Sequence, residues 1–293
     1  MPASSAVDLN QHLAAMRPRL HRYCARMVGS VIDGEDVLQD ALIKAVEAFA
    51  AAPIENVEAW LFRIAHNTAL DFLRRRNRLD ALHSAEEVEM IADRLDDLER
   101  RQIAASSLRT SMRLPVAQRA SVILMDVLGC SLQEVCGIMD FSLPAVKAAL
   151  HRGRTQLRGF AREPDDAPRP GLPEADRIRL NAYVSRFNAR DFEAIRAMIA
   201  DDVRLELVNR TRMNGKVEVS RYFTNYSKVR DWHLVPGQVE GRPAILVFDP
   251  NAPDAPPRSF MLLAWSADKV AAIRDFRHAP YAIDGAEWVV DAG

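Results

Sequence analysis

Two consecutive helical patterns between Asp33 and Arg78 constrain this chain more than any other feature. The first, DGEDVLQDALIKAVEAF, is an amphipathic helix with an acidic front. After a short link that contains Pro53 comes AWLFRIAHNTALDFLRRRNR, an aromatic-led helix that ends in four arginines within five residues. An acidic helix suits a basic protein surface, and clustered arginines suit phosphate. The pair predicts a chain that contacts a protein and DNA at the same time.

Composition excludes several other classes of protein. The length of 293 residues predicts two or three domains, and a formal net charge of −1 gives no general argument for nucleic acid. Cys24, Cys130 and Cys136 form no C-x-x-C pair and have no histidine at zinc-ligand spacing, which fits a reducing compartment and no metal site. No apolar run approaches the ~20 residues of a membrane span, and no signal peptide is evident. We therefore expect a cytoplasmic protein without cofactor or membrane contact.

Composition also divides the chain into segments. Between Asp80 and Glu99 eight acidic residues stand against one base, Arg94, which predicts a solvated linker. A Pro-rich stretch, EPDDAPRPGLP, marks a second boundary. We expect two all-α domains and a C-terminal α+β domain, with linkers between them: residues 8–79 (helical), 80–106 (acidic linker), 107–161 (helical), 162–174 (Pro-rich linker) and 175–290 (α+β).

The helix from Trp60 to Arg78 has a face suited to DNA. At about 100° per residue, one narrow sector collects Arg63, Asn67, Asp71, Arg74 and Arg78. Another side can pack inward, with Leu61, Ile64, Ala65, Thr68 and Phe72. Arg74, Arg75, Arg76 and Arg78 suit phosphates, and Asn67 suits a base edge. Taken alone, this pattern also fits a solvated face whose basic end complements the helix dipole. A second DNA-binding signal favours the first interpretation.

That second signal is a helix-turn-helix pattern. Ser131 and Glu134 form a capping box for a helix that runs to about Met139, and Asp140 to Ser142 form a turn. The next helix, with Pro144 in its first turn, carries five bases and no acid from Phe141 to Arg162. Because Gly153 weakens this helix by about 1 kcal/mol, we expect it to end near Leu157. The inner face is supplied by Val146, Leu150 and Leu157. A short helix, a tight turn and a basic second helix indicate binding in a major groove, although an ordinary αα-hairpin has the same outline.

With both patterns in hand, residues 8–160 resemble the extracytoplasmic-function group of sigma-70-type transcription initiation factors. One block, DGEDVLQDALIKA followed by AWLFRIAHNTALDFLRRR, is similar to region 2 of that family. The other, LPVAQRASVILMDVLGCSLQEVCGIMDFSLPAVKAALHRGRTQLR, is similar to region 4. The two blocks stand in the family's order with a short linker between them. The resemblance implies a protein that binds core RNA polymerase, recognises the −35 and −10 promoter elements and helps to open the promoter.

The resemblance also implies roles for individual residues. Contacts with core polymerase fall on Glu35, Asp36, Leu38, Gln39 and Asp40. Contacts with the −10 element fall on Glu55 and Asn56, which would capture a flipped base, and on Arg63, Asn67, Arg74, Arg75 and Arg76. Contacts with the −35 element fall on Lys147, His151, Arg152 and Arg154.

After about Ala175 the pattern changes to helices followed by strands. Helices are predicted at residues 177–188, 192–200 and 216–226. Strands are predicted at residues 203–208, 232–239, 244–248, 259–265 and 270–277. A few helices followed by a run of antiparallel strands indicates an α+β domain.

This segment resembles a SnoaL-like domain, the cone-shaped fold shared with nuclear transport factor 2 and ketosteroid isomerase. The resemblance rests on the order of elements, on the opening RFNARDFEAIRAMIADDVRLEL and on the NGK sequence at Asn214, Gly215 and Lys216. In some sigma factors of this group such a domain is a built-in regulator. The resemblance therefore implies a regulatory contact at these three residues, and we expect no enzymatic activity.

Two other functions stay open at this point. A ligand-sensing helix-turn-helix regulator would explain the second helical block, but it gives no reason for the acidic helix at Asp33–Asp40. A SnoaL-like enzyme would need acid–base groups, for which the candidates are Asp202, Asp231, His233, Asp275 and His278. An anti-sigma protein or a small-molecule ligand would be a further partner.

Overall fold

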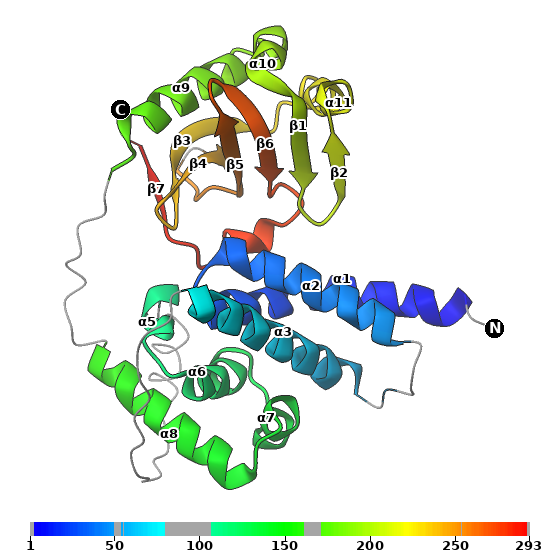
Figure 1. Cartoon of the computed structure of the whole chain (residues 1–293), viewed down its shortest axis with the longest axis vertical. Helices are drawn as coiled ribbons and strands as arrows, with labels where there is room; N and C mark the ends of the chain where they lie inside the picture. Colours follow the sequence, from blue (N-terminus) through cyan, green and yellow to red (C-terminus); the bar gives the residue numbers. More distant parts are fainter. Residues whose placement is uncertain are drawn as a thin grey trace. The chain divides into compact units, whose positions relative to one another are not determined.

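The computed structural model describes residues 3–49, 54, 56–79, 107–160, 171–252 and 254–291. The chain divides into two units, Met1–Asp166 and Ala167–Gly293 (Figure 1). The predicted acidic linker and Glu55 lie outside the described residues, and so does most of the Pro-rich linker.

Helices form all of the described part of the first unit, as the sequence predicts. The first lobe consists of α1 (Ala3–Val28), α2 (Val31–Phe49) and α3 (Val57–Leu79). The second lobe consists of α5 (Leu108–Met112), α6 (Val116–Val122), the π-helical turn η1 (Ile123–Val127), α7 (Leu132–Met139) and α8 (Leu143–Phe160).

Helix α8 continues beyond the predicted end near Leu157, to Phe160. Gly153, which suggested an early end, lies where α8 packs closely against α6. A Cβ atom at that position would lie 2.9 Å from Cγ2 of Val122. The close packing explains a small residue here, and it offsets the low helix propensity of glycine.

One continuous apolar core runs through both lobes. It contains Tyr23, Leu38 and Phe62 of the first lobe together with Leu124 and Val135 of the second, and each of these side chains is fully buried. Tyr23 packs edge-on against Phe62, and its hydroxyl lies 2.6 Å from Nδ1 of His66. The two lobes are therefore parts of one packed body.

Three polar or close contacts join the lobes around this core. The Nε of Arg63, on α3, donates a hydrogen bond to the carbonyl of Gly137 on α7 at 3.0 Å. The Nη2 of Arg19, on α1, donates to the carbonyl of Leu128 at 3.2 Å. Met112, on α5, packs over the turn between α1 and α2, where Gly29 leaves room for its side chain. We call this packed arrangement the closed form.

A buried ion pair fixes α8 to η1 within the second lobe. Arg154 makes a bidentate contact with Asp126, with Nε–Oδ2 at 2.9 Å and Nη2–Oδ1 at 2.5 Å. The Asp126 side chain is only 1% exposed and that of Arg154 is 14% exposed. Because both charges are largely removed from water, each depends on the other for its stabilisation.

The second unit is an α+β fold with a mixed sheet, as expected. Its helices are α9 (Glu174–Asn188), α10 (Phe192–Met198) and α11 (Lys216–Tyr226). Its strands are β1 (Ile199–Leu207), β2 (Thr211–Asn214), β3 (His233–Val239), β4 (Arg242–Phe248), β5 (Ser259–Ser266), β6 (Lys269–Asp275) and β7 (Trp288–Val290). The sheet order is β2-β1-β6-β5-β4-β3-β7, and the helices pack on the curved sheet (Figure 1).

Several details of this unit differ from the sequence prediction, and among them α9 begins at Glu174 rather than residue 177 and β6 ends at Asp275 rather than residue 277. The second helix ends at Met198 rather than residue 200, because β1 begins at Ile199. The edge strands β2 and β7 were not predicted, since four and three residues are too short to show a strand period. The strands β3 to β6 pair antiparallel as predicted, but β1 pairs parallel with β6, which brings the start of the domain beside its end.

Aromatic side chains fill the space between the helices and the sheet. The ring of Phe187 lies 5.0–6.3 Å, between centroids, from those of Phe192, Phe223, Tyr226 and Trp232. All five side chains are buried. This cluster gives the second unit its own core, separate from that of the helical unit.

The buried ion pair of the second lobe gives a first prediction. Asp126→Ala leaves the Arg154 guanidinium largely buried without a counter-ion, which we expect to lower the free energy of unfolding by about 3 kcal/mol. Urea denaturation followed by circular dichroism measures this loss. The control is Asp71→Ala, because Asp71 is half exposed in its pairs with Lys44 and Arg74 and should contribute about 1 kcal/mol or less. Equal losses in the two variants would contradict a structural role for the Asp126 pair.

Candidate nucleic-acid interface

The predicted DNA face of α3 is on the surface. Arg63, Asn67, Arg74 and Arg75 are exposed, whereas Leu61, Ala65 and Thr68 on the predicted inner side are buried. Asp71 interacts with two of these arginines: its carboxylate accepts from Arg74 at 3.3 Å, and its carbonyl accepts from Nε of Arg75 at 3.3 Å. The side chain of Arg78 lies outside the described residues. The structure therefore brings together four of the residues predicted to contact the −10 element.

Two other predicted −10 contacts have structural roles in the closed form. Asn56 caps α3, since its Oδ1 accepts from the backbone N–H of Ala59 at 3.0 Å. Arg76 is half buried, and its Nη1 donates to the carbonyl of Val28 at the end of α1 at 2.9 Å. Its guanidinium lies 5.7 Å from the ring of Phe72. Arg76 thus holds α3 against α1.

The helix-turn-helix forms at the predicted residues and by the predicted caps. Ser131 and Glu134 make both hydrogen bonds of the capping box, at 2.7 and 3.3 Å. The hydrogen bond that the backbone N–H of Ser131 donates to the carboxylate is the main cause that lowers the pKa of Glu134. Asp140 ends α7 in the left-handed conformation with φ of 56°, which an aspartate tolerates better than most residues. The hydroxyl of Ser142 then accepts from the N–H of Ala145 at 3.4 Å and starts α8.

The predicted −35 residues differ in their exposure. Lys147 is exposed near the start of α8, and His151 and Arg152 are half buried further along. Arg154 is instead held in the ion pair with Asp126. The beginning of α8 also presents Phe141 and Leu143, which are 40% and 44% exposed. The sequence prediction considered only basic residues of this helix. It therefore missed these two exposed apolar side chains, which flank the Ser142 cap.

The residues of α2 that were predicted to contact polymerase also divide into exposed and buried ones. Asp36 and Asp40 are exposed and Gln39 is half buried. Leu38 lies in the core, and Glu35 is 1% exposed in an ion pair with Arg17. The buried pair joins α2 to α1, so Glu35 contributes to the fold of the lobe.

An apolar part of the α2 surface was missed by the sequence reasoning. Ile43 is 52% exposed and Val46 is 54% exposed. They follow Asp36, Gln39 and Asp40 at helical spacings of three, four and seven, so the five residues share one face. This helical spacing is the sequence pattern that could have revealed the apolar part of the α2 face. Large apolar side chains left in water beside acids are typical of a protein-binding surface.

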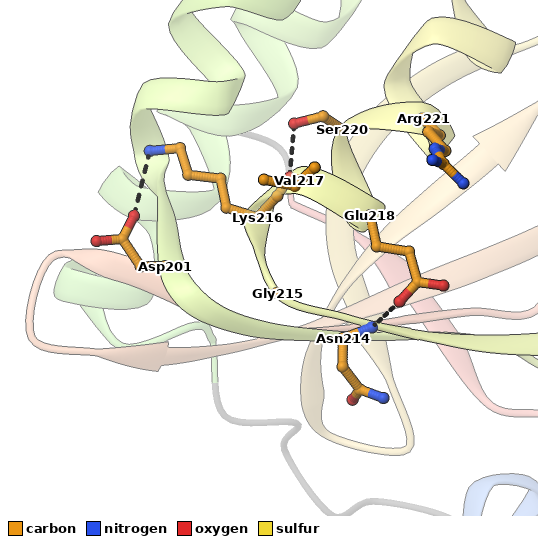
Figure 2. A pocket seen from close by; sticks show the side chains of 8 residues that line it. All are labelled: Asp201, Asn214, Gly215, Lys216, Val217, Glu218, Ser220 and Arg221. Atoms are coloured by element: carbon orange, nitrogen blue, oxygen red, sulfur yellow. Dashed lines mark hydrogen bonds and ion pairs between the residues drawn. The ribbon is translucent and has the colours of Figure 1, made fainter.

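The predicted regulatory residues lie where β2 meets α11. Asn214 ends β2, Gly215 precedes the helix, and Lys216 begins it. They line an open pocket of about 680 Å³ together with Asp201, Val217, Glu218, Ser220 and Arg221 (Figure 2). Lys216 reaches Asp201 with Nζ–Oδ1 at 3.7 Å, and Glu218 accepts from the N–H of Asn214 at 2.8 Å. Val217 is 84% exposed at this pocket.

Two of the acid–base candidates, Asp275 and Asp231, share Arg277 as a partner, whose backbone N–H donates to Asp275 Oδ1 at 2.9 Å and whose guanidinium pairs with Asp231. Asp275 is fully buried, and its Oδ2 accepts hydrogen bonds from the hydroxyls of Tyr222 and Tyr226 at 2.9 and 2.8 Å. Burial raises the pKa of Asp275. Asp231 and His233 are exposed, and Asp231 pairs with Arg277. Asp202 is exposed on β1, and His278 lies 3.2 Å from Arg210.

Within the described ranges, no helix combines the length and apolar character that crossing a bilayer requires. No group of three or more side chains with metal-binding atoms gathers there either.

Comparison with known proteins places these surfaces in a family. Residues 13–79 match the model of Sigma-70 region 2, and residues 108–157 match that of Sigma-70, region 4. The ECF RNA polymerase sigma factor SigM of Mycobacterium tuberculosis is 33% identical over 140 residues, which cover 47% of this chain and 69% of SigM. SigG of the same organism is 32% identical over 217 residues, 64% of this chain.

The coverage of these relatives differs, and the chain spans only 58% of the length of SigG. The crystal structure of the M. tuberculosis sigma factor SigJ aligns over 91% of this chain and 95% of its own, with 18% identity and a TM-score of 0.36. Two Sigma-70 regions are matched in order, and SigM is one-third identical over more than two thirds of its length. The chain therefore belongs to the ECF RNA polymerase sigma factors.

Proposed function

We propose that this chain is a transcription initiation factor that binds core RNA polymerase through α2 and reads promoter DNA through α3 and α8. The observation that carries the proposal is the presence of an acidic and apolar face on α2 beside two basic helices, in a chain of this family. Core polymerase and promoter DNA are its partners, and the cytoplasm is its compartment. An anti-sigma protein or a small ligand is a further partner in this proposal.

The α2 face supports the polymerase contact. Asp36 and Asp40 supply negative charge, and Ile43 and Val46 supply apolar area, within one stripe. Charge guides association, and burial of the apolar side chains provides most of the affinity.

The exposed cations of α3 and α8 support the DNA contacts. Arg74 and Arg75 suit phosphates near the −10 element, and Asn67 suits a base edge. Lys147, near the start of α8, has the position that a recognition helix presents to the major groove. We assign Arg154 and Glu35 to the fold, because each is committed to a buried ion pair.

Simultaneous reading of both elements requires the lobes to separate. The −35 and −10 elements lie about 25 base pairs apart, or about 85 Å at 3.4 Å per base pair. In the closed form α7 packs directly on α3, which is itself about 35 Å long at 1.5 Å per residue. The 27 residues from 80 to 106 can reach at most about 95 Å. The closed form is therefore a resting state, and binding to polymerase opens it.

The second unit acts as a regulator in this proposal. An exposed Val217 beside Lys216 and Arg221, in an open pocket, suits a contact with another protein surface. The alternatives have less support. A ligand-sensing repressor has no use for the α2 face, and two acid–base candidates of an enzyme are engaged by other side chains, Asp275 by Tyr222 and Tyr226 and Asp231 by Arg277.

Transcription with purified core polymerase tests the proposal. Run-off transcripts should require the chain and a promoter selected by it. A chain that neither binds core polymerase nor gives a promoter-dependent transcript would overturn the proposal. Tight binding of the chain to duplex DNA without polymerase would favour the ligand-sensing repressor instead.

The first prediction of this proposed function concerns the α2 face. Ile43→Asp should weaken binding to core polymerase at least about tenfold, because it places a charge in the apolar part of the contact. The measurement is a titration of labelled chain with core polymerase. Glu193→Lys is the control, since Glu193 is exposed on α10 of the other unit. The assignment of α2 fails if Ile43→Asp binds as tightly as the control.

The second prediction concerns the phosphate contacts of α3. Arg75→Ala should weaken promoter binding by the polymerase complex on all sequences alike and reduce the salt dependence of log K by about one. Asn67→Ala should instead relax base preference at the −10 element and leave the salt dependence unchanged. Binding is measured over a salt series on two promoter sequences. These roles would be excluded if Arg75→Ala relaxed the base preference and Asn67→Ala reduced the salt dependence.

The third prediction concerns regulation. Removing the residues after Pro173 should change promoter activity, because the regulatory unit is lost. Lys216→Glu should change activity in the same direction, and Glu193→Lys should leave it unchanged. The measurement is transcription with equal amounts of folded protein. Wild-type activity in both the truncated chain and Lys216→Glu would remove the regulatory role and leave the sigma-factor role intact.

A further inference from the structure

Arg119 is a buried arginine whose charge has no acidic partner among the described residues. It lies on α6 and is 3% exposed. In the part of the chain that the structure describes, its Nη1 donates hydrogen bonds to Met112 alone, with the thioether sulfur at 2.6 Å and the carbonyl at 3.5 Å. Its Nε has no hydrogen-bond partner among the described residues. A thioether is a weak acceptor, so this guanidinium has lost its water without adequate replacement.

Two other largely buried arginines of the helical unit show the contrast. Arg17 pairs with Glu35, and Arg154 pairs with Asp126. Within the described ranges, no carboxylate contributes to the electrostatic surroundings of Arg119. Burial lowers its pKa to about 10, and the positive charge of Arg76 adds to that effect.

The burial of Arg119 is tied to the closed form. Its electrostatic neighbours Tyr23 and Arg76 are on α1 and α3, in the first lobe, whereas Arg119 belongs to the second. Met112, which accepts hydrogen bonds from the Arg119 side chain, is also the residue that packs over Gly29 of the first lobe. Separation of the lobes would return the guanidinium to water.

We propose that Arg119 keeps the closed form only marginally stable, so that core polymerase can open it. The charge opposes closure because its desolvation is not compensated, while the shared apolar core favours closure. The balance between these two effects sets how much polymerase is needed to open the chain. This inference rests on the proposed function, in which the open form is the active one.

Two chemically different substitutions should shift this balance in the same direction. Arg119→Met removes the charge and keeps the length of the side chain. Met112→Glu leaves Arg119 in place and supplies a carboxylate at the atom that Nη1 now contacts. Each should stabilise the closed form roughly tenfold relative to the open form, since each relieves an unpaired buried charge. The double variant should lose this gain, because its glutamate is buried without Arg119.

The experiment measures opening in the full-length chain by energy transfer. Dyes are attached through Asn77→Cys on α3 and Gln156→Cys on α8, both exposed positions, in a Cys136→Ser background. Core polymerase is then titrated. The concentration that opens half of the molecules should rise about tenfold for Arg119→Met and for Met112→Glu, and should return toward the wild-type value in the double variant.

The outcomes separate this inference from the proposed function. A wild-type chain that never opens with core polymerase contradicts the proposed function. A wild-type chain that opens, together with an Arg119→Met chain that opens as easily or more easily, contradicts the role of Arg119. If Arg119→Met does not fold, Met112→Glu decides alone: opening that is no harder than in the wild type overturns the inference.

Discussion

The apolar core shared by the two helical lobes is the constraint on which the rest of this protein depends. Tyr23 and Phe62 on one side and Leu124 and Val135 on the other are buried together, so neither lobe completes its core alone in the closed form. The same packing ties Arg63, a predicted reader of the −10 element, to the carbonyl of Gly137. In the proposed function, the packing that stabilises the free chain therefore limits the access of Arg63 to DNA.

Buried charged residues affect how firmly the two lobes close on each other. Glu35 and Asp126 each hold an arginine inside a single lobe, which strengthens the lobe without affecting closure. Arg119 is buried near the junction and has no such partner among the residues that the structure describes. A junction made only of apolar side chains would close more firmly, and a fully paired one would too. The incomplete pairing leaves the two forms close enough in free energy for a binding partner to choose between them.

Much of the fold could be predicted from the sequence, because local sequence patterns determine where many helices and turns form. The capping box at Ser131 and Glu134, the turn at Asp140 and helix α11 all form at the expected residues. The short edge strands β2 and β7 could not be predicted, since pairing with a neighbour rather than periodicity creates them. Site residues were harder still. Nothing local distinguishes Arg154, which is buried against Asp126, from Lys147, which is exposed, and the apolar surface at Ile43 and Val46 appears only once the helices are packed.

The central claim is that lobes packed together in the free chain separate to contact two distant DNA elements. Hydroxyl-radical footprinting of a promoter bound by the chain and core polymerase tests it most directly. The account predicts two protected segments in one complex, about 25 base pairs apart, which is farther than the closed form can reach. A single protected segment no longer than one helical turn would contradict it.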